Sequence, residues 1–223
     1  MLKYFHKTLT ALSFFIPLII YIITMAPTTS FWDCPEFIST SYILGVPHPP
    51  GSPLYLILGN FFSSIPFFND IGARVNLISP ITSALSVMFL YLIIVYLIEE
   101  YKGKPKNISD IFVIYFSAFI ASLTFAVTDA HWFNAVEAEV YSISTFFTSI
   151  VVWMILKWSR YKYKDWNVKY LLIIIYMFGL ATGLHLLNLL TLPFVALIIY
   201  FKKFKFHISS FLLTILLTAL AFI

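Results

Sequence analysis

The stretch TLTALSFFIPLIIYIITMA, residues 8–26, decides the fold of this 223-residue chain. It carries no charged side chain and is long enough for a helix to cross the hydrocarbon layer of a membrane. The whole chain has the same character, since 61% of its residues are hydrophobic, 11% are charged and the mean hydropathy is +0.91. One soluble core could not bury so much apolar surface. The sequence therefore predicts an integral membrane protein.

Charge, cysteine content and the N-terminus exclude several other classes. The net charge of +4 comes from lysines that mark membrane topology, so nothing indicates a nucleic-acid partner. A single cysteine, Cys34, excludes an internal disulfide and a cysteine-based metal cluster. Cleavage of a signal peptide after Ala26 would leave Pro27 first, and the apolar run is too long for one. We expect residues 8–26 to stay in the chain as its first span.

Further apolar segments follow the first one at intervals along the chain. A span needs roughly 20 apolar residues, because an unpaired backbone amide is costly in lipid. These segments predict an all-α polytopic membrane protein with about seven spans and a single transmembrane domain over residues 1–223. The last segment ends with the chain, so we expect an N-terminal part of a longer protein. The seven expected spans are residues 9–26, 75–98, 110–128, 139–158, 169–186, 188–201 and 208–223.

The basic residues predict an orientation. With a cytoplasmic N-terminus, 13 of the 14 lysines and arginines fall on the inner side, and Arg74 alone lies outside. The outer side then holds residues 27–74, residues 129–138 and the turn at 185–188. This side would be periplasmic or extracellular in a bacterium and lumenal in a eukaryote.

The first outer segment contains SFWDCPEFISTSYILGVPHPPGSP, residues 30–53. PEFISTSYIL followed by Gly45 predicts a short helix with a glycine stop, and SPLYLILGNFFSSI before Pro66 predicts a second. Both are too short to span, so we expect them to lie along the membrane interface or to pack back into the bundle. VPHPPGSP between them cannot be helical, because proline lacks an N–H donor and restricts the residue before it.

Asp33 and Glu36 are the first candidate catalytic residues. A spacing of three places both on one helix face, where one carboxylate can act as a base and the other can position it. The alternative is a capping box, with Asp33 as N-cap, Glu36 at the third helical position and Pro35 in the first turn. The two interpretations are compatible.

The second outer segment, TDAHWFNAVEAEVYS at residues 128–142, is unusually polar for a turn between spans. Trp132 suits stacking on a sugar ring, although an interfacial aromatic belt explains it equally. Glu137 and Glu139 are about 200° apart on a helix, so we expect only one of them to face a cavity. A carboxylate at the start of a span indicates function, because burial there penalises its charge.

Two further candidates lie near the outer face. In GLATGLHLLNLLTLP, residues 179–193, Gly179 and Gly183 predict close helix approach, while His185 and Asn188 share a face. A lone histidine is more often a packing residue than a ligand, and no HExxH spacing supports zinc.

Arg74, the one basic residue expected outside, suits an anionic group such as a lipid phosphate. The alternative for Arg74 is an ion pair with Asp70, four residues earlier in the chain.

Four ordered motifs resemble one protein family. They are APTTSFWDCPEFISTSYILGVPHPPGSPLYLILGNFF, ARVNLISPITSALSVMFLY, WFNAVEAEVYSIST and GLATGLHLLNLLTLP, covering about residues 9–193. Together they resemble a family of membrane proteins of formerly unknown function that includes a eukaryotic protein O-mannosyltransferase and is placed in the GT-C class of glycosyltransferases.

The resemblance implies a GT-C-like helical bundle that takes sugar from a polyprenyl-phosphate donor on the extracytoplasmic face. The implied reaction transfers a mannose-like hexose to a hydroxyl of a protein or glycan acceptor. Asp33 would be the base, Glu36 its partner or an alternative base, and Arg74 the phosphate clamp. His48 and His185 would contact phosphate or sugar. The remaining substrate-binding candidates are Trp132, Glu137, Glu139 and Asn188.

Two other functions fit a polytopic chain of this kind. One is a transporter or flippase of a lipid-linked sugar, and the other is a non-catalytic fragment. Transporters usually show internal repeats and polar groups near the midplane, whereas here the polar groups gather at one face. The sequence requires no cofactor and leaves the need for a divalent metal open.

Overall fold

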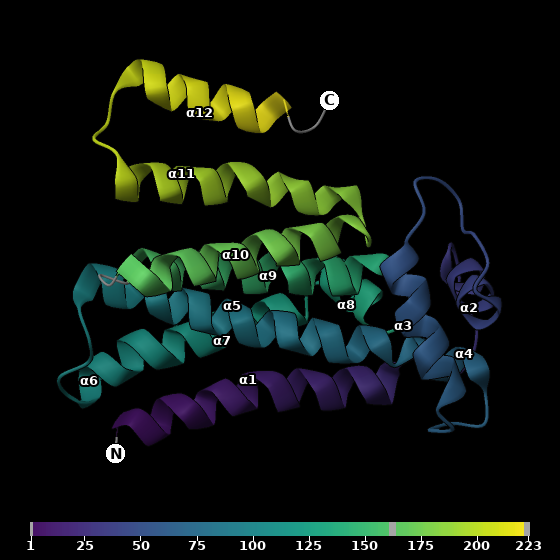
Figure 1. Ribbon diagram of the computed structural model, residues 1–223. Helices are drawn as coiled ribbons and strands as arrows, with labels where there is room; N and C mark the ends of the chain where they lie inside the picture. The colour runs from purple at the N-terminus through teal and green to yellow at the C-terminus, as the bar shows by residue number, and fades with distance from the viewer. Residues whose placement is uncertain (1, 161–163, 221–223) are drawn as a thin grey trace.

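The computed structural model describes residues 2–160 and 164–220, and every regular element in these ranges is a helix (Figure 1). Five of them are long and apolar enough to cross a membrane, which confirms the expectation of an all-α chain with multiple membrane spans. Several spans join consecutive elements without a break in the chain. The five are α1 (Leu2–Thr24), α4 with α5 (Ile71–Asn76 and Ile78–Lys102), α6 with η1 and α7 (Ile108–Ile111, Phe112–Phe116 and Ser117–Ala126), α9 (Val140–Arg160) and η2 with α11 (Leu186–Thr191 and Leu192–Lys203).

The other two expected spans, residues 169–186 and 208–223, correspond to shorter apolar helices. The apolar part of α10 (Lys164–Thr182) is Val168–Thr182, because the chain leaves the helix before His185. The last helix, α12, covers Ile208–Leu220, and the final three residues of the expected span lie outside the described residues. As a whole α10 has 19 residues, as many as the candidate span Ile108–Ala126, whereas α12 has 13.

Helix α5 is the central element of the bundle. It packs against α1, α7 and α9 (Figure 1). Its residues Ala84, Val87 and Tyr91 are fully buried. The α1 helix contributes Tyr21, whose hydroxyl donates to the carbonyl of Ala126 at 2.7 Å. These contacts fix the relative positions of the two outer segments, which lie at the same end of the bundle.

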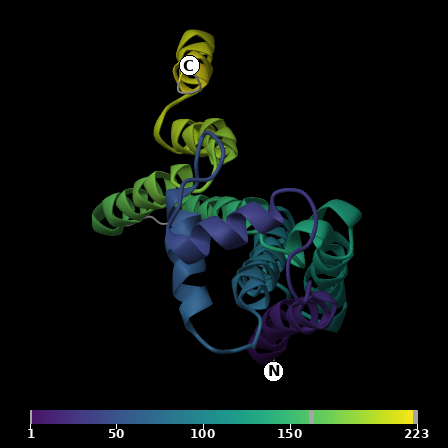
Figure 2. The same ribbon diagram turned by 90° about the vertical axis from the view of Figure 1, so that its right-hand side faces the viewer.

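Short helices cover that end, and Figure 2 views them along the bundle. Both helices expected in the first outer segment are present, as α2 (Cys34–Ile43) and α3 (Pro53–Ser64), and residues 45–52 between them are not helical. The stop of α2 differs from the expectation, because Leu44 rather than Gly45 takes the left-handed conformation, with φ of 51°. The second outer segment forms a helix that the sequence did not indicate, α8 (Asp129–Ala135).

The glycine that allows close helix packing is also not the expected one. A Cβ at Gly59 of α3 would collide with the side chain of Ser41 on α2, so only glycine fits this contact. At Gly179, by contrast, a Cβ would meet no atom within 4 Å. The prediction of a close helix approach at Gly179 is therefore wrong. At Gly183, a Cβ added to the glycine would lie 3.6 Å from Leu54.

Candidate active site

The carboxylates of Asp33 and Glu36 lie at the start of α2, as the sequence predicts, but not as a capping box. Asp33 occupies the N-cap position and its side chain makes no capping hydrogen bond. Glu36 turns to His48 instead, while Pro35 lies in the first turn as expected. The capping box in the described chain is at Asn107 and Asp110, before α6. Asp33 therefore leaves its carboxylate exposed, with no helix contact to occupy it.

Glu36 and His48 close the proline-rich loop onto α2. The Oε1 atom of Glu36 accepts from the backbone N–H of His48 at 2.7 Å, and Oε2 lies 2.8 Å from His48 Nδ1. The ring contact lowers the pKa of Glu36 and raises the pKa of His48 from their usual values, because each group stabilises the charged form of the other. The pair thus holds the 45–52 loop in place.

Asn76 joins the two outer segments and was not singled out from the sequence. Its amide nitrogen donates to the carbonyls of Ala26 and Thr28, both at 2.8 Å. Its amide oxygen accepts from the backbone N–H of Ala138 at 2.9 Å and from the Cys34 thiol at 3.6 Å. The side chain is fully buried, so it fixes the start of α2 against the 136–139 turn.

Glu137 and Glu139 are both buried beside this junction, with 1% and 4% of their surface exposed. Residues 136–139 are not helical, so the expectation that only one of them faces inward, which assumed a helix, does not hold. Glu137 Oε1 and Glu139 Oε2 have no hydrogen-bond partner in the described chain. None of the carboxylates of Asp33, Glu137 and Glu139 forms an ion pair with a described lysine or arginine.

Glu139 is the strongly perturbed acid of this group. Burial, together with the negative charges of Asp33 and Glu137, raises its pKa to about 7. The hydroxyl of Tyr55 is buried and interacts electrostatically with Glu139. It has no hydrogen-bond partner among the described residues. A carboxyl with this pKa can hold or release a proton at neutral pH, which is a property of catalytic sites.

Replacing Glu139 with glutamine tests this perturbation. Because the folded protein holds the Glu139 proton more tightly than the unfolded chain does, its stability falls as the pH rises from 4.5 to about 7. We expect Glu139→Gln to raise the free energy of unfolding at pH 8 by up to about 3 kcal/mol and to change little at pH 4. Unfolding in detergent at both pH values measures this. The exposed Asp129→Asn is the control, and an equal effect of both variants at pH 8 would refute the perturbed carboxyl.

Asp33, Glu36 and His48 form the one group in the described residues whose ligand atoms are spaced for a metal ion. One oxygen or nitrogen of each residue lies within 4.8 Å of the others. Two carboxylates and an imidazole suit a divalent cation such as Mn²⁺ or Zn²⁺. Residue spacing in the sequence does not reveal this group, because it is the fold of the 45–52 loop that brings His48 to Asp33 and Glu36.

His185 and Asn188 come to the same end of the bundle in different roles. His185 is close enough to His48 for charge interaction, and burial lowers its pKa. Its Nδ1 accepts from the N–H of Leu187 at 3.1 Å and its ring packs on Tyr141. Asn188 is 2% exposed and bonds to carbonyls of Ala181 and His185 and to a hydroxyl. Asn188 therefore holds the turn.

Arg74 is bound to the loop between α3 and α4. Its guanidinium donates to the carbonyls of Ser63, Phe68 and Asn69 at 3.0, 2.6 and 3.3 Å. The alternative ion pair with Asp70 is absent, because Asp70 caps α4 by accepting from the N–H of Ala73. Three contacts leave part of the five-donor guanidinium free for an anion.

Trp132 and His131 contact α1 and α7. The Trp132 ring meets Tyr21 edge to face at 5.8 Å, and His131 lies 4.3 Å from the ring centre of Phe125. Burial lowers the pKa of His131 to about 4, so this imidazole is neutral at physiological pH. These contacts agree better with a packing role for Trp132 than with sugar stacking.

Comparison with known proteins supports the resemblance seen in the motifs. The Protein O-mannosyl-transferase tmem260 of Dictyostelium discoideum is 25% identical over 189 residues, or 79% of this chain and 21% of that protein. The Protein O-mannosyl-transferase TMEM260 of Mus musculus is 23% identical over 133 residues, covering 60% of this chain and 17% of that protein. The chain thus spans about a fifth of these relatives' length. No solved structure matches it.

A family model matches most of the chain. It is described as "Protein O-mannosyl-transferase TMEM260 N-terminal domain" and covers residues 33–208, which include all the candidate site residues. The matched residues make up more than half of the chain, so this protein belongs to the TMEM260 N-terminal domain family of protein O-mannosyl-transferases.

Proposed function

We propose that this chain forms the membrane part of a GT-C-type glycosyltransferase. In this proposal it moves a mannose-like hexose from a polyprenyl-phosphate donor to a hydroxyl acceptor, as in protein O-glycosylation, on the extracytoplasmic face. The distribution of basic residues supports a cytoplasmic N-terminus and places the carboxylate group outside. The two relatives are named as protein O-mannosyl-transferases, which supports sugar transfer as the reaction class.

One observation carries the proposal. The exposed carboxylate of Asp33 stands beside buried acids at one end of a membrane bundle, and its charge reaches Glu139. A transferase needs a base at the surface of the membrane, where a water-soluble acceptor can meet a lipid-bound donor. Asp33 has the exposure for this, and it belongs to the matched region of a transferase family.

The proposed step uses Asp33 as the base. A hydroxyl oxygen of the acceptor attacks the anomeric carbon of the sugar, while Asp33 takes the hydroxyl proton. The bond between that carbon and the phosphate oxygen breaks, and the electron pair leaves with the lipid phosphate. This leaving group is already a stable anion, so it requires a cation more than a general acid.

Glu36 and His48 position the site in this proposal. Both oxygens of Glu36 are engaged by His48, whereas the exposed carboxylate of Asp33 makes no capping hydrogen bond and is free to take a proton. His48, whose pKa is raised by its contact with Glu36, and the free donors of Arg74 are the groups that can meet the phosphate. If a divalent cation binds, Asp33, Glu36 and His48 would hold it, and it would supply positive charge to the leaving phosphate.

The buried acids and the neighbouring turn complete the proposed site. Glu137 and Glu139 would accept hydrogen bonds from sugar hydroxyls through their unpartnered oxygens. His185 would contact the sugar or phosphate from the 185–188 turn, which Asn188 holds. Trp132 remains a substrate-binding candidate only if it leaves its contact with Tyr21.

A transfer assay distinguishes this enzyme from a transporter or flippase of the same lipid. The intact protein is reconstituted in liposomes with radiolabelled polyprenyl-phosphate mannose and a protein acceptor on the outer side. We expect the label to become covalently attached to the acceptor. Movement of labelled lipid across the membrane with no labelled acceptor would refute the transferase and favour the transporter.

A further inference from the structure

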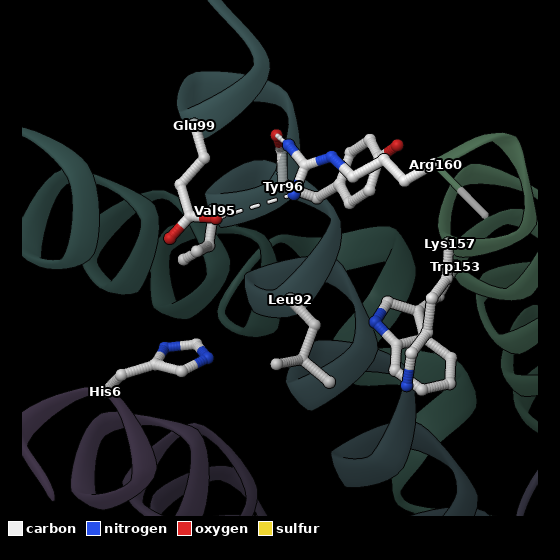
Figure 3. A pocket seen from close by; sticks show the side chains of 8 residues that line it. All are labelled: His6, Leu92, Val95, Tyr96, Glu99, Trp153, Lys157 and Arg160. Atoms are coloured by element: carbon white, nitrogen blue, oxygen red, sulfur yellow. Dashed lines mark hydrogen bonds and ion pairs between the residues drawn. The ribbon is translucent and has the colours of Figure 1, made fainter. Parts of the chain in front are cut away.

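A cavity lies at the opposite end of the bundle from the carboxylates, between α5 and α9, with His6 of α1 in its wall. It has a volume of about 360 Å³, and Figure 3 shows the side chains that line it. Leu92, Val95 and Trp153 form its apolar part. Glu99, Lys157 and Arg160 belong to the last turns of the two helices and form its charged rim.

The lining changes from apolar to charged along the helix axes. Trp153 precedes Lys157 by one turn on α9, and Val95 precedes Glu99 by one turn on α5. Four residues rise about 6 Å along the axis, so the apolar part lies deeper in the membrane than the charged rim. This order matches a membrane lipid, whose acyl chains lie below its head group.

Most of the charge at the rim is already neutralised within the protein. Arg160 Nε donates to Glu100 at 2.7 Å, and its NH1 atom lies 3.5 Å from Glu99. The guanidinium also lies over the Tyr96 ring, as Figure 3 shows, and donates to the Tyr96 carbonyl at 3.0 Å. These contacts occupy Arg160, whose single positive charge offsets one of the two carboxylate charges of Glu99 and Glu100.

Lys157 is the cation that remains. Its ammonium lies 4.5 Å from the centre of the Trp153 ring, and no carboxylate of the described chain pairs with it. A single unpaired ammonium above an apolar cavity is complementary to one phosphate attached to acyl chains.

We propose that this cavity binds a glycerophospholipid, with the phosphodiester against Lys157 and an acyl chain against Leu92, Val95 and Trp153. The site is separate from the proposed transferase site and does not depend on it. A lipid held between α5 and α9 would link two helices that begin beside the proposed transferase site. Asn76 lies just before α5, and Glu139 lies just before α9.

Lipid binding to the intact protein in detergent, measured by native mass spectrometry, tests the proposal. The probes are dioleoyl phosphatidylglycerol, dioleoylglycerol with the same tails and no phosphate, and glycerol 3-phosphate with no tails. We expect the phospholipid to bind at least about fivefold more tightly than dioleoylglycerol. Equal binding of the two lipids would overturn phosphate recognition. Binding of glycerol 3-phosphate at the same concentrations would indicate a site for a soluble anion and would overturn the lipid assignment.

Two variants and a control locate the binding. Lys157→Gln should remove the preference for phosphatidylglycerol, whereas Lys203→Gln, which removes an exposed charge at the end of α11, should keep it. Leu92→Phe fills the apolar part and should weaken phosphatidylglycerol binding with helix content unchanged by circular dichroism. Retention of the preference in Lys157→Gln, or full binding in Leu92→Phe, would show that the lipid lies elsewhere.

Discussion

Asp33→Asn in the intact protein is expected to lower the rate of sugar transfer by about 10²- to 10⁴-fold, the usual contribution of a general base. Asparagine keeps the shape of the side chain but cannot take the acceptor proton. Because the Asp33 side chain makes no capping hydrogen bond, the change should leave α2 intact. The rate of label transfer at saturating donor and acceptor measures the effect.

Asp129→Asn is the matched control for this experiment. Asp129 is also an exposed aspartate of an outer segment, at the first position of α8. We expect this variant to transfer sugar at the wild-type rate. Wild-type transfer by Asp33→Asn would show that another group is the base, and Glu139 would then be the next candidate because of its raised pKa.

The second large effect is expected at Asn76. Asn76→Ala would remove the partners of two backbone carbonyls, at Ala26 and Thr28, and of the N–H of Ala138. An unsatisfied buried polar group costs about 1–3 kcal/mol, so we expect a loss of at least about 3 kcal/mol of stability. Thermal unfolding in detergent, followed by circular dichroism, measures this loss.

Asn60→Ala provides the comparison, because Asn60 also donates to two carbonyls, those of Ser41 and Tyr42, but is only partly buried. Water can replace its contacts, so we expect a clearly smaller loss of stability. Asn76→Ala should also reduce transfer at temperatures where the protein remains folded, since it releases the start of α2 from the 136–139 turn. Equal losses in the two asparagine variants would contradict the role of Asn76 as the link.

Local patterns in the sequence predicted the helices well. Apolar length identified the five candidate spans among the seven expected, and the prolines and glycines of residues 45–53 separated α2 from α3. The same local signals failed where the outcome depends on other parts of the chain. Glu36 suits a capping box by spacing, but His48, twelve residues away, offers it both an N–H and a ring nitrogen.

The acidic residues of the candidate site were predicted from the sequence, whereas the residues that hold them in place were missed. Asn76 looks like one polar residue at the start of a span, and only the approach of residues 26–34 to the 136–139 turn shows its function. Burial of both Glu137 and Glu139 required a non-helical turn, which helical spacing could not predict. Helix α8 was missed because its seven residues carry no apolar periodicity of useful length.

The position of the donor phosphate tests the proposed site most directly. A polyprenyl-phosphate analogue with a photoreactive group beside the phosphate would be cross-linked to the intact protein, and the labelled peptides identified by mass spectrometry. We expect labels within residues 31–53, 68–74 and 137–141, and we expect them unchanged in Lys157→Gln, because the lipid cavity lies at the other end of the bundle. Labels confined to residues 92–99 and 153–160 would contradict a transferase site at Asp33.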